Sequence, residues 1–180
     1  MIPYERLGQR EEAFRYIGQH LPDKPVIVET GTVREVGNWA GDGQSTLVWD
    51  HFADILDGIV YTIDIEDTGL QLVDELNLER TVAVQGDSLD MIPFINTTID
   101  FLYLDSYDID WNNPEPSAEH HLQELLAALP MLQDQALVAV DDNRPEAGKG
   151  FKVAEYLETL GAVEVVSGYV RVWRLTNGYR

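Results

Sequence analysis

Four side chains that could bind a metal ion or activate an oxygen nucleophile follow two apolar segments of the chain. Asp105 follows "IDFLYL", and Asp141, Asp142 and Asn143 follow "ALVAV". If these segments are neighbouring parallel strands, about 4.8 Å apart, the carboxylates meet at one edge of the sheet and repel one another. A divalent cation removes that conflict, and oxygen ligands suit Mg²⁺ or Ca²⁺ better than zinc. The alternative is that Asp142 or Asn143 only caps a turn or a helix.

A second candidate site lies in "ETGTVREVGNWAGDGQST", residues 29–46. Its glycines would let bare backbone approach a ligand, and the carboxylate of Glu29 could bind an ammonium group. A P-loop is disfavoured because Gln44 stands where the lysine of that motif belongs. A dinucleotide fingerprint is matched only in part, and it lies about a dozen residues too late. The structural alternative is that Glu29 and Gly31 only shape a turn.

Short apolar runs alternate with segments of helical periodicity along the whole chain. The last two runs are separated only by Ser167-Gly168, which is too short for a crossover, so they must pair as an antiparallel hairpin. We therefore expect an α/β fold with one doubly wound, Rossmann-like sheet of seven strands, mostly parallel, with a C-terminal antiparallel β-hairpin. A single domain, residues 1–180, would have an N-terminal helix at about 4–20 and a core at about 26–175. The predicted strands are Val26–Glu29, Ile59–Asp64, Thr81–Gln85, Ile99–Leu104, Ala136–Val140, Ala162–Val166 and Tyr169–Leu175.

The order of these elements and motifs resembles that of class I S-adenosylmethionine (SAM)-dependent methyltransferases. Motif I would be Glu29-Thr30-Gly31-Thr32 and, after a longer loop than usual, Gly43-Gln44-Ser45-Thr46. Asp64 would accept hydrogen bonds from ribose hydroxyls, a feature shared with NAD sites, and Gly86-Asp87-Ser88 would contact the adenine. The cofactor-binding residues that the resemblance implies are Glu29, Gly31, Thr32, Gly43, Ser45, Asp64, Ile65, Asp87, Ser88 and Asp105.

Within that family, the acidic side chains resemble those of metal-dependent O-methyltransferases. The catechol and caffeoyl-CoA type implies Asp105, Asp142 and Asn143 as metal ligands, and the macrocin type adds Asp141. The cation would lower the pKa of a substrate hydroxyl and orient its oxygen toward the SAM methyl group. The [Asp/Asn]-Pro-Pro-aromatic signature of many amino-methylating enzymes is absent after the fourth strand, which favours oxygen as the acceptor.

The general base is where the chain departs from the catechol-type pattern. Those enzymes have a lysine three positions after the metal-binding aspartate, and this chain has Asp108 there. His120 or His121 could be an alternative base, although such histidines more often decorate a solvent-exposed helix face. Lys149 could serve instead, or it could only offset the nearby acids. The predicted catalytic residues are therefore Asp105, His120 and Lys149.

Composition limits the partners of the protein. The 180 residues include 32 acidic and 12 basic side chains, and the formal charge of −20 repels nucleic acid and anionic membranes. There is no cysteine, which excludes disulfides and thiolate metal sites. No apolar run approaches the length of a membrane span and the first residues lack a secretory signal, so we expect a cytoplasmic protein.

The leading hypothesis is a SAM-dependent methyltransferase acting on a hydroxyl of a small molecule or sugar, assisted by Mg²⁺ or Ca²⁺. The alternatives are an NAD(P)-dependent oxidoreductase and a SAM-binding domain without turnover. The insertion Val33–Asp42 could form a lid with Trp39 as its apolar cover, or Trp39 could pack this loop onto the domain. The N-terminal helix could cover the site or join a homodimer.

Overall fold

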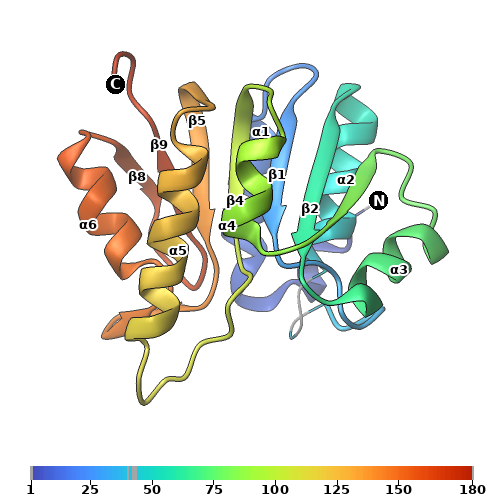
Figure 1. Ribbon diagram of the computed structural model, residues 1–180, viewed down its shortest axis with the longest axis horizontal. Helices are drawn as coiled ribbons and strands as arrows, with labels where there is room; N and C mark the ends of the chain where they lie inside the picture. The colour runs from blue at the N-terminus through green and yellow to red at the C-terminus, as the bar shows by residue number, and fades with distance from the viewer. Residues whose placement is uncertain (1, 40, 42–43, 180) are drawn as a thin grey trace.

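A seven-stranded sheet lies at the centre of the computed structural model, which describes residues 2–39, 41 and 44–179 (Figure 1). The strand order is β3-β2-β1-β4-β5-β9-β8. The pairs among the first five strands of that order are parallel, whereas β9 runs antiparallel to both β5 and β8. The predicted fold class is thereby confirmed. The strands are β1 (Val26–Thr30), β2 (Ile59–Asp64), β3 (Thr81–Gln85), β4 (Ile99–Leu104), β5 (Leu132–Val140), β8 (Val163–Val166) and β9 (Arg171–Arg174).

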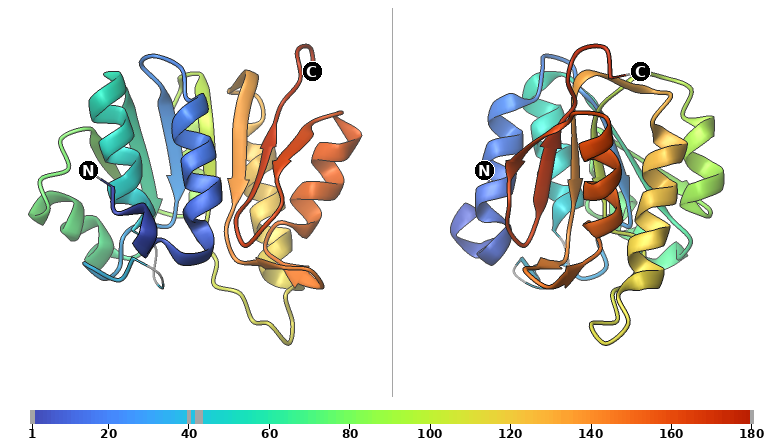
Figure 2. Two further views of the ribbon diagram at one scale, coloured as in Figure 1. Left: turned by 180° about the vertical axis from the view of Figure 1, so that it is seen from behind. Right: turned by 90° about the vertical axis from the view of Figure 1, so that its left-hand side faces the viewer.

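Helices cover both faces of the sheet, which is why its central strands are mostly apolar. Helices α1 (Glu11–His20) and α2 (Ser45–Leu56) cover the face turned to the viewer in the left panel of Figure 2. The core beneath them is aromatic, with Phe14 and Tyr103 packed around Trp49. The other face carries α4 (Ser88–Met91), α5 (Glu115–Ala128) and α6 (Phe151–Thr159) over an aliphatic core. Helix α3 (Asp67–Glu75) packs beside β3 and β2.

Several element boundaries differ from the predictions. The N-terminal segment is two 3₁₀ turns, η1 (Tyr4–Arg6) and η2 (Gly8–Arg10), before α1, because Gly8 adopts a positive φ of 57° and interrupts the helix. Strand β5 begins at Leu132 rather than Ala136, since Leu132 already pairs with Ile99 ahead of a register shift. A short hairpin of β6 (Asn143–Arg144) and β7 (Ala147–Gly148) was not predicted, and neither was η3 (Ile92–Phe94).

The carboxyl ends of β1, β2, β4 and β5 lie along one edge of the sheet, at the bottom of Figure 1. Gly31, directly after β1, makes the closest approach there. Its φ is +82°, and a Cβ atom at this position would lie 2.8 Å from the carbonyl oxygen of Asp105. The tips of β1 and β4 therefore touch through bare backbone, and the loops that follow them are held side by side. Within the described residues, no helix combines the length and apolar character that crossing a membrane requires.

Candidate functional site

Glu29, at the end of β1, is a buried carboxylate bound by hydroxyl groups. Its Oε2 atom accepts hydrogen bonds from Thr46 Oγ1 at 2.7 Å and Thr62 Oγ1 at 2.8 Å. Its Oε1 atom is buried and has no hydrogen-bond partner among the described residues. Burial raises the pKa of Glu29 to about 7, although the surrounding hydroxyls offset part of that effect. Oε1 is closed off from solvent, and Ser45 and Trp49 lie near enough to lower the pKa of the same carboxyl.

The loop after β1 is tied to the start of α2 by side chains of the "GQST" segment. Thr46 Oγ1 accepts a hydrogen bond from the backbone N–H of Val33, and Gln44 bonds to backbone groups of Glu35 and Gly37. Gln44, which stands where a P-loop would have lysine, therefore has a structural role here. Trp39 packs against the aromatic core with the Arg6 guanidinium over its ring, the second of the two roles predicted for it. The predicted cofactor residue Gly43, with positions 40 and 42 of the insertion, lies outside the described residues.

A cavity of about 270 Å³ opens beyond the ends of β2, β3 and β4, and we call it the β2–β4 pocket. It brings together four residues that the family resemblance singled out, Asp64, Ile65, Asp87 and Ser88. Each of Asp64 and Asp87 accepts, through its Oδ1 atom, a hydrogen bond from the backbone N–H of the residue two positions later in the chain. This hydrogen bond fixes the orientation of the carboxylate. Ile65 is 65% exposed, an apolar side chain with no covering partner at the rim. The remaining lining residues are Ile63, Gly86, Ser106, Tyr107 and His120.

Glu124, on α5, is a fully buried acid beneath this pocket that sequence reasoning missed. Its carboxylate accepts hydrogen bonds from Ser88 Oγ, from Ser106 Oγ at 2.6 Å and from Thr30 Oγ1 at 3.1 Å. His120 Nε2 lies 3.3 Å from the same carboxylate. Burial would raise the pKa of Glu124, but the histidine and the hydroxyls outweigh it and lower that pKa. Two pocket-lining serines are thus fixed by one buried charge.

The two histidines of α5 are not on a solvent-exposed face, so that expectation is wrong. His120 lines the β2–β4 pocket, and its hydrogen bond with Glu124 raises its pKa above the usual 6.5. His121 is fully buried, and its Nδ1 atom lies 2.6 Å from the carbonyl oxygen of Ser117. Burial lowers the pKa of His121 to about 4, so this ring is neutral at physiological pH.

A smaller cavity of about 130 Å³, the acidic pocket, lies at the ends of β1, β4 and β5. The predicted cofactor residues Gly31, Thr32 and Ser45 line it together with Asp105. Asp108, which replaces the expected lysine, lies there too and forms an ion pair with Arg34 at 2.9 Å. The other lining residues are Arg10, Gly41 and Asp142.

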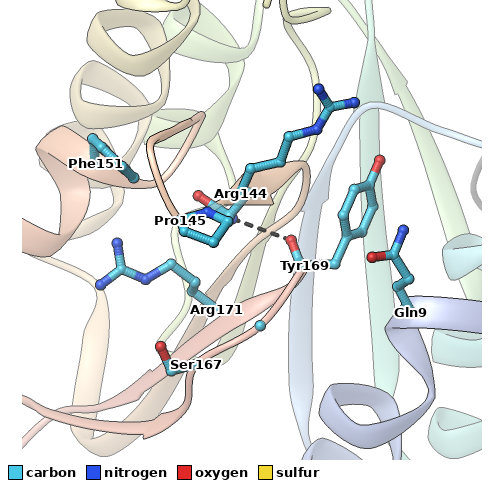
Figure 3. A pocket seen from close by; sticks show the side chains of 9 residues that line it. Gln9, Arg144, Pro145, Phe151, Ser167, Tyr169 and Arg171 are labelled. Atoms are coloured by element: carbon cyan, nitrogen blue, oxygen red, sulfur yellow. Dashed lines mark hydrogen bonds between the residues drawn. The ribbon is translucent and has the colours of Figure 1, made fainter.

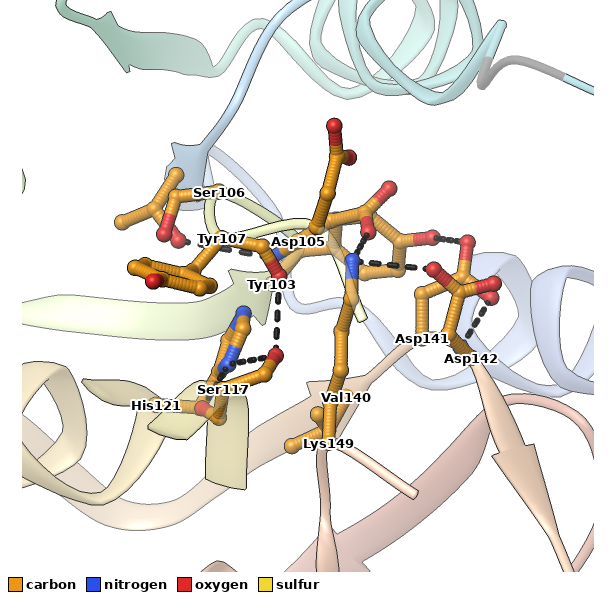
Figure 4. Close-up of polar contacts among 12 residues, drawn as sticks. Tyr103, Asp105, Ser106, Tyr107, Ser117, His121, Val140, Asp141, Asp142 and Lys149 are labelled. Atoms are coloured by element: carbon orange, nitrogen blue, oxygen red, sulfur yellow. Dashed lines mark hydrogen bonds and ion pairs between the residues drawn. The ribbon is translucent and has the colours of Figure 1, made fainter. Parts of the chain in front are cut away.

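Two buried cations form ion pairs with the acids at the ends of β4 and β5, and Figure 4 shows one of them, Lys149, between Asp105 and Asp142. Lys149 Nζ lies 2.6 Å from Asp105 Oδ1 and 2.9 Å from Asp142 Oδ2. Arg10 Nε lies 2.6 Å from Asp141 Oδ2, an atom that also accepts a hydrogen bond from Tyr103 OH at 2.7 Å. Burial alone would lower the pKa of Lys149, but the carboxylates of Asp105 and Asp142 raise it. Lys149 is therefore an ammonium ion and not a free base.

The expected metal ligands do not fit a divalent cation in this arrangement. The Lys149 ammonium lies between Asp105 and Asp142, and Asp141 is bound to Arg10. The amide of Asn143 donates to the carbonyl groups of Val140 and Asp141, and its oxygen accepts from Gly150 N–H. Over residues 2–39, 41 and 44–179, no three His, Cys, Asp or Glu side chains are grouped to hold a metal ion.

The largest cavity, about 480 Å³, lies next to the acidic pocket and is called the Tyr169 pocket (Figure 3). Tyr169 connects the two, because its hydroxyl donates a hydrogen bond to Asp142 while its ring lies against the Arg10 guanidinium. The remaining lining residues come from η2, the β6–β7 hairpin, α6 and the β8–β9 hairpin: Gln9, Asn143, Arg144, Pro145, Phe151, Ser167, Gly168 and Arg171. This cavity could not be predicted from the sequence, because its lining residues come together only when the two hairpins fold against η2.

Comparison with solved structures places the fold among methyltransferases. A Clostridium thermocellum protein provisionally assigned as an rRNA methylase superposes with a TM-score of 0.62 at 16% identity, over 94% of this chain and 97% of the other. The MycE methyltransferase of mycinamycin biosynthesis, solved with Mg, S-adenosylhomocysteine (SAH) and mycinamycin VI, gives 0.64 at 19% identity over 93% of this chain. The chain covers 49% of MycE, about half its length. The O-methyltransferase NovP gives 0.60 at 16% identity, over 97% of this chain and 78% of NovP.

No protein-family model matches the sequence, and no curated protein shows significant similarity to it. At identities of 16% and 19%, the structural neighbours establish the fold and leave the activity to the site itself.

Proposed function

We propose that this chain is a SAM-dependent methyltransferase that transfers a methyl group to a hydroxyl of a small molecule or sugar. The observation that carries the proposal is the β2–β4 pocket, where Asp64, Ile65, Asp87 and Ser88 meet at the ends of the strands. Ligands of open α/β sheets bind at this edge. The pocket adjoins the acidic pocket through the consecutive residues Asp105 and Ser106, so a nucleoside and a reacting group can lie side by side.

The residues present fit SAM in three ways. The carboxylates of Asp64 and Asp87 are acceptors for ribose and adenine donors, and exposed Ile65 offers an apolar surface to a base. At Gly31 the space of a side chain is filled by the backbone of Asp105, which brings the ends of β1 and β4 together at the wall of the acidic pocket. Glu29, the acid at the end of β1, lies two residues before Gly31 of the acidic pocket, where the family resemblance places an acid that binds the SAM ammonium group. When bound, SAM supplies an electrophilic methyl group on its sulfonium.

The acceptor would bind in the Tyr169 pocket. Its polar groups, among them Gln9, Ser167 and Tyr169, suit a polyhydroxylated molecule, and its 480 Å³ accommodates a sugar-sized one. Asp105 and Asp142 line the adjoining acidic pocket, and either carboxylate would accept the proton of a hydroxyl that enters it. The structural neighbour NovP, an O-methyltransferase, is in line with oxygen as the acceptor atom. The charge of −20 argues against RNA, which an rRNA methylase must bind.

Isothermal titration calorimetry with SAH tests cofactor binding. Asp64→Ala should weaken SAH binding by about 10- to 100-fold, because a hydrogen bond to a charged group contributes about 1.5–3 kcal/mol. Asp74→Ala, an exposed aspartate on α3 outside the pocket, is the matched control and should bind as the wild type does. Binding of NAD in place of SAH would refute the proposal in favour of an oxidoreductase.

Turnover is tested by SAH release from SAM with a panel of sugar and diol acceptors. Release that depends on an acceptor hydroxyl, and is lost when that hydroxyl is blocked, would support O-methylation. SAH binding without release from any acceptor of the panel would favour a SAM-binding domain without turnover.

A further inference from the structure

Lys149 is buried in the interior of an acidic protein that has only three lysines. Lys24 and Lys152, the other two, form ion pairs at the surface. A lysine is almost never fully buried unless it is paired, because its ammonium group loses its hydration. Lys149 is paired twice, through the contacts of Nζ with Asp105 at the end of β4 and with Asp142 after β5. Figure 4 shows its side chain extending between these two acids.

The backbone around Lys149 is fixed so that the side chain must point inward. The β6–β7 hairpin turns the chain back on itself, and the N–H of Lys149 donates to the carbonyl oxygen of Asp142. The flanking residues are Gly148 and Gly150, where a Cβ atom would lie 2.4 Å and 2.8 Å from Asn143 Oδ1. The "GKG" sequence therefore allows the segment to pack tightly onto Asn143. Gly150 is the N-cap residue directly before α6, and its N–H donates a hydrogen bond to Asn143 Oδ1.

We propose that the Lys149 ammonium occupies the position of a divalent cation, offsetting part of the charge of Asp105 and Asp142 and holding them at the wall of the acidic pocket. Lys149 does not itself line that pocket, whereas both of its partners do. It is therefore a positioning residue that acts through them. Methyl transfer at this site needs no divalent metal. That last statement rests on the proposed function, but the claim that the lysine occupies the cation position does not.

The test measures metal binding, which is independent of turnover. Thermal unfolding of the wild type, Lys149→Ala and Lys152→Ala is followed with MgCl₂, MnCl₂ or KCl at matched ionic strength. Wild type and Lys152→Ala should respond to each divalent salt no more than to KCl. Lys149→Ala should unfold at a lower temperature and regain about 5 °C or more with saturating Mg²⁺ or Mn²⁺, because two unpaired carboxylates then form a cation site. Ethylammonium, which supplies the lost ammonium group on a chain one carbon shorter than the one removed, should restore part of the same stability.

A saturable rise in the wild-type Tm with Mg²⁺ beyond the KCl response would overturn the proposal. So would a Lys149→Ala variant that folds but responds to neither the divalent cations nor ethylammonium. If Lys149→Ala does not fold, Lys149→Ala/Asp142→Asn removes one unpaired charge, and the wild-type titration alone remains decisive. Activity in EDTA provides a second measurement, since loss of wild-type turnover in EDTA would also refute the proposal. SAH calorimetry separates this outcome from a failure of the proposed function.

Discussion

Replacing Glu124 by glutamine should disrupt the β2–β4 pocket from beneath. The carboxylate is fully buried and accepts hydrogen bonds from Ser88, Ser106 and Thr30, with His120 at 3.3 Å. Glutamine has nearly the same shape but presents one oxygen and one NH₂ group. The substitution therefore removes the charge and turns one acceptor into a donor, without creating a cavity.

The magnitude follows from the contacts. Ser88 and Ser106 both donate to Oε1, and the amide oxygen can keep both bonds. Each falls from a charged to a neutral hydrogen bond, at a loss of about 1 kcal/mol. Thr30 donates to Oε2, which becomes an NH₂ group, and losing that bond costs about 1–2 kcal/mol. The sum is about 3 kcal/mol of unfolding free energy, or a Tm lower by about 6–12 °C for a chain of this size.

The loss should depend on pH because Glu124 and His120 are coupled. The lowered pKa of Glu124 means that its contribution exists above about pH 4.5 and disappears as pH falls through the folded-state pKa. The raised pKa of His120 adds stability that is complete below about pH 6.5 and disappears as pH rises through its folded-state pKa. The difference between wild type and Glu124→Gln should therefore be largest between about pH 4.5 and 6.5.

Urea unfolding followed by tryptophan fluorescence, from pH 4 to pH 8, measures this difference. Glu119→Gln is the matched control, because Glu119 is an exposed acid on the same helix and pairs with Lys152. Above about pH 4.5 its profile should run parallel to that of the wild type, because the hydrogen bonds from Lys152 and Gln123 lower the pKa of Glu119 and affect the pH dependence only below that pH. A Glu124→Gln variant within about 1 kcal/mol of wild type across the range would refute the view of Glu124 as the anchor of the serines. SAH affinity should fall in parallel, since both serines line the pocket.

Two further substitutions test the end of β1. Because burial raises the pKa of Glu29 from 4.5 to about 7, the wild type should lose about 3 kcal/mol relative to Glu29→Gln as pH rises from 4.5 to above 7. Urea midpoints at several pH values check this, and parallel profiles for the two proteins would contradict it. Gly31→Ala should destabilise by about 1–3 kcal/mol more than Gly37→Ala in urea unfolding, because both have positive φ but only Gly31 faces the backbone of Asp105. Equal losses would mean that the tips of β1 and β4 can separate.

The sheet could be predicted from the sequence because its central strands are covered by helices on both faces. A strand buried in this way is a mostly apolar run, and β2 and β4 have the predicted bounds. So does β3, although it is an edge strand with several exposed side chains. The Ser167-Gly168 turn likewise required an antiparallel end. The bounds of the N-terminal helix and of β5 could not be predicted from the sequence in the same way. Their bounds depend on left-handed residues, Gly8 and Gln135, whose conformation is set by tertiary packing.

The sequence was enough to predict where most polar residues of the site lie, but it was not enough to predict which side chains pair with them. An acid at the end of a buried strand stands out in the sequence, and the structure brings Asp64, Asp105 and Asp142 to the expected edge. Their counter-ions come from elsewhere in the chain. Arg10 is 131 residues from Asp141, and no local pattern marks it. Glu124 was hidden for a different reason: it lies within a leucine-rich helix where an acid is normally solvated.

The partners also change the electrostatic argument for the ligand. At the ends of β4 and β5, four acids face three cations: Asp105, Asp108, Asp141 and Asp142 against Arg10, Arg34 and Lys149. With all seven groups ionised the local formal charge is −4 + 3 = −1, but burial and the neighbouring acids raise the pKa of Asp105 to about 8, so this excess is complete only above that pH. Four acids without counter-ions would require a metal ion, and a cluster with no net charge would not distinguish a cationic ligand from an anionic one. An excess of one negative charge attracts a single cationic centre such as a sulfonium and repels the pyrophosphate of a dinucleotide. The same cations that displace a metal from this edge thus favour SAM over NAD.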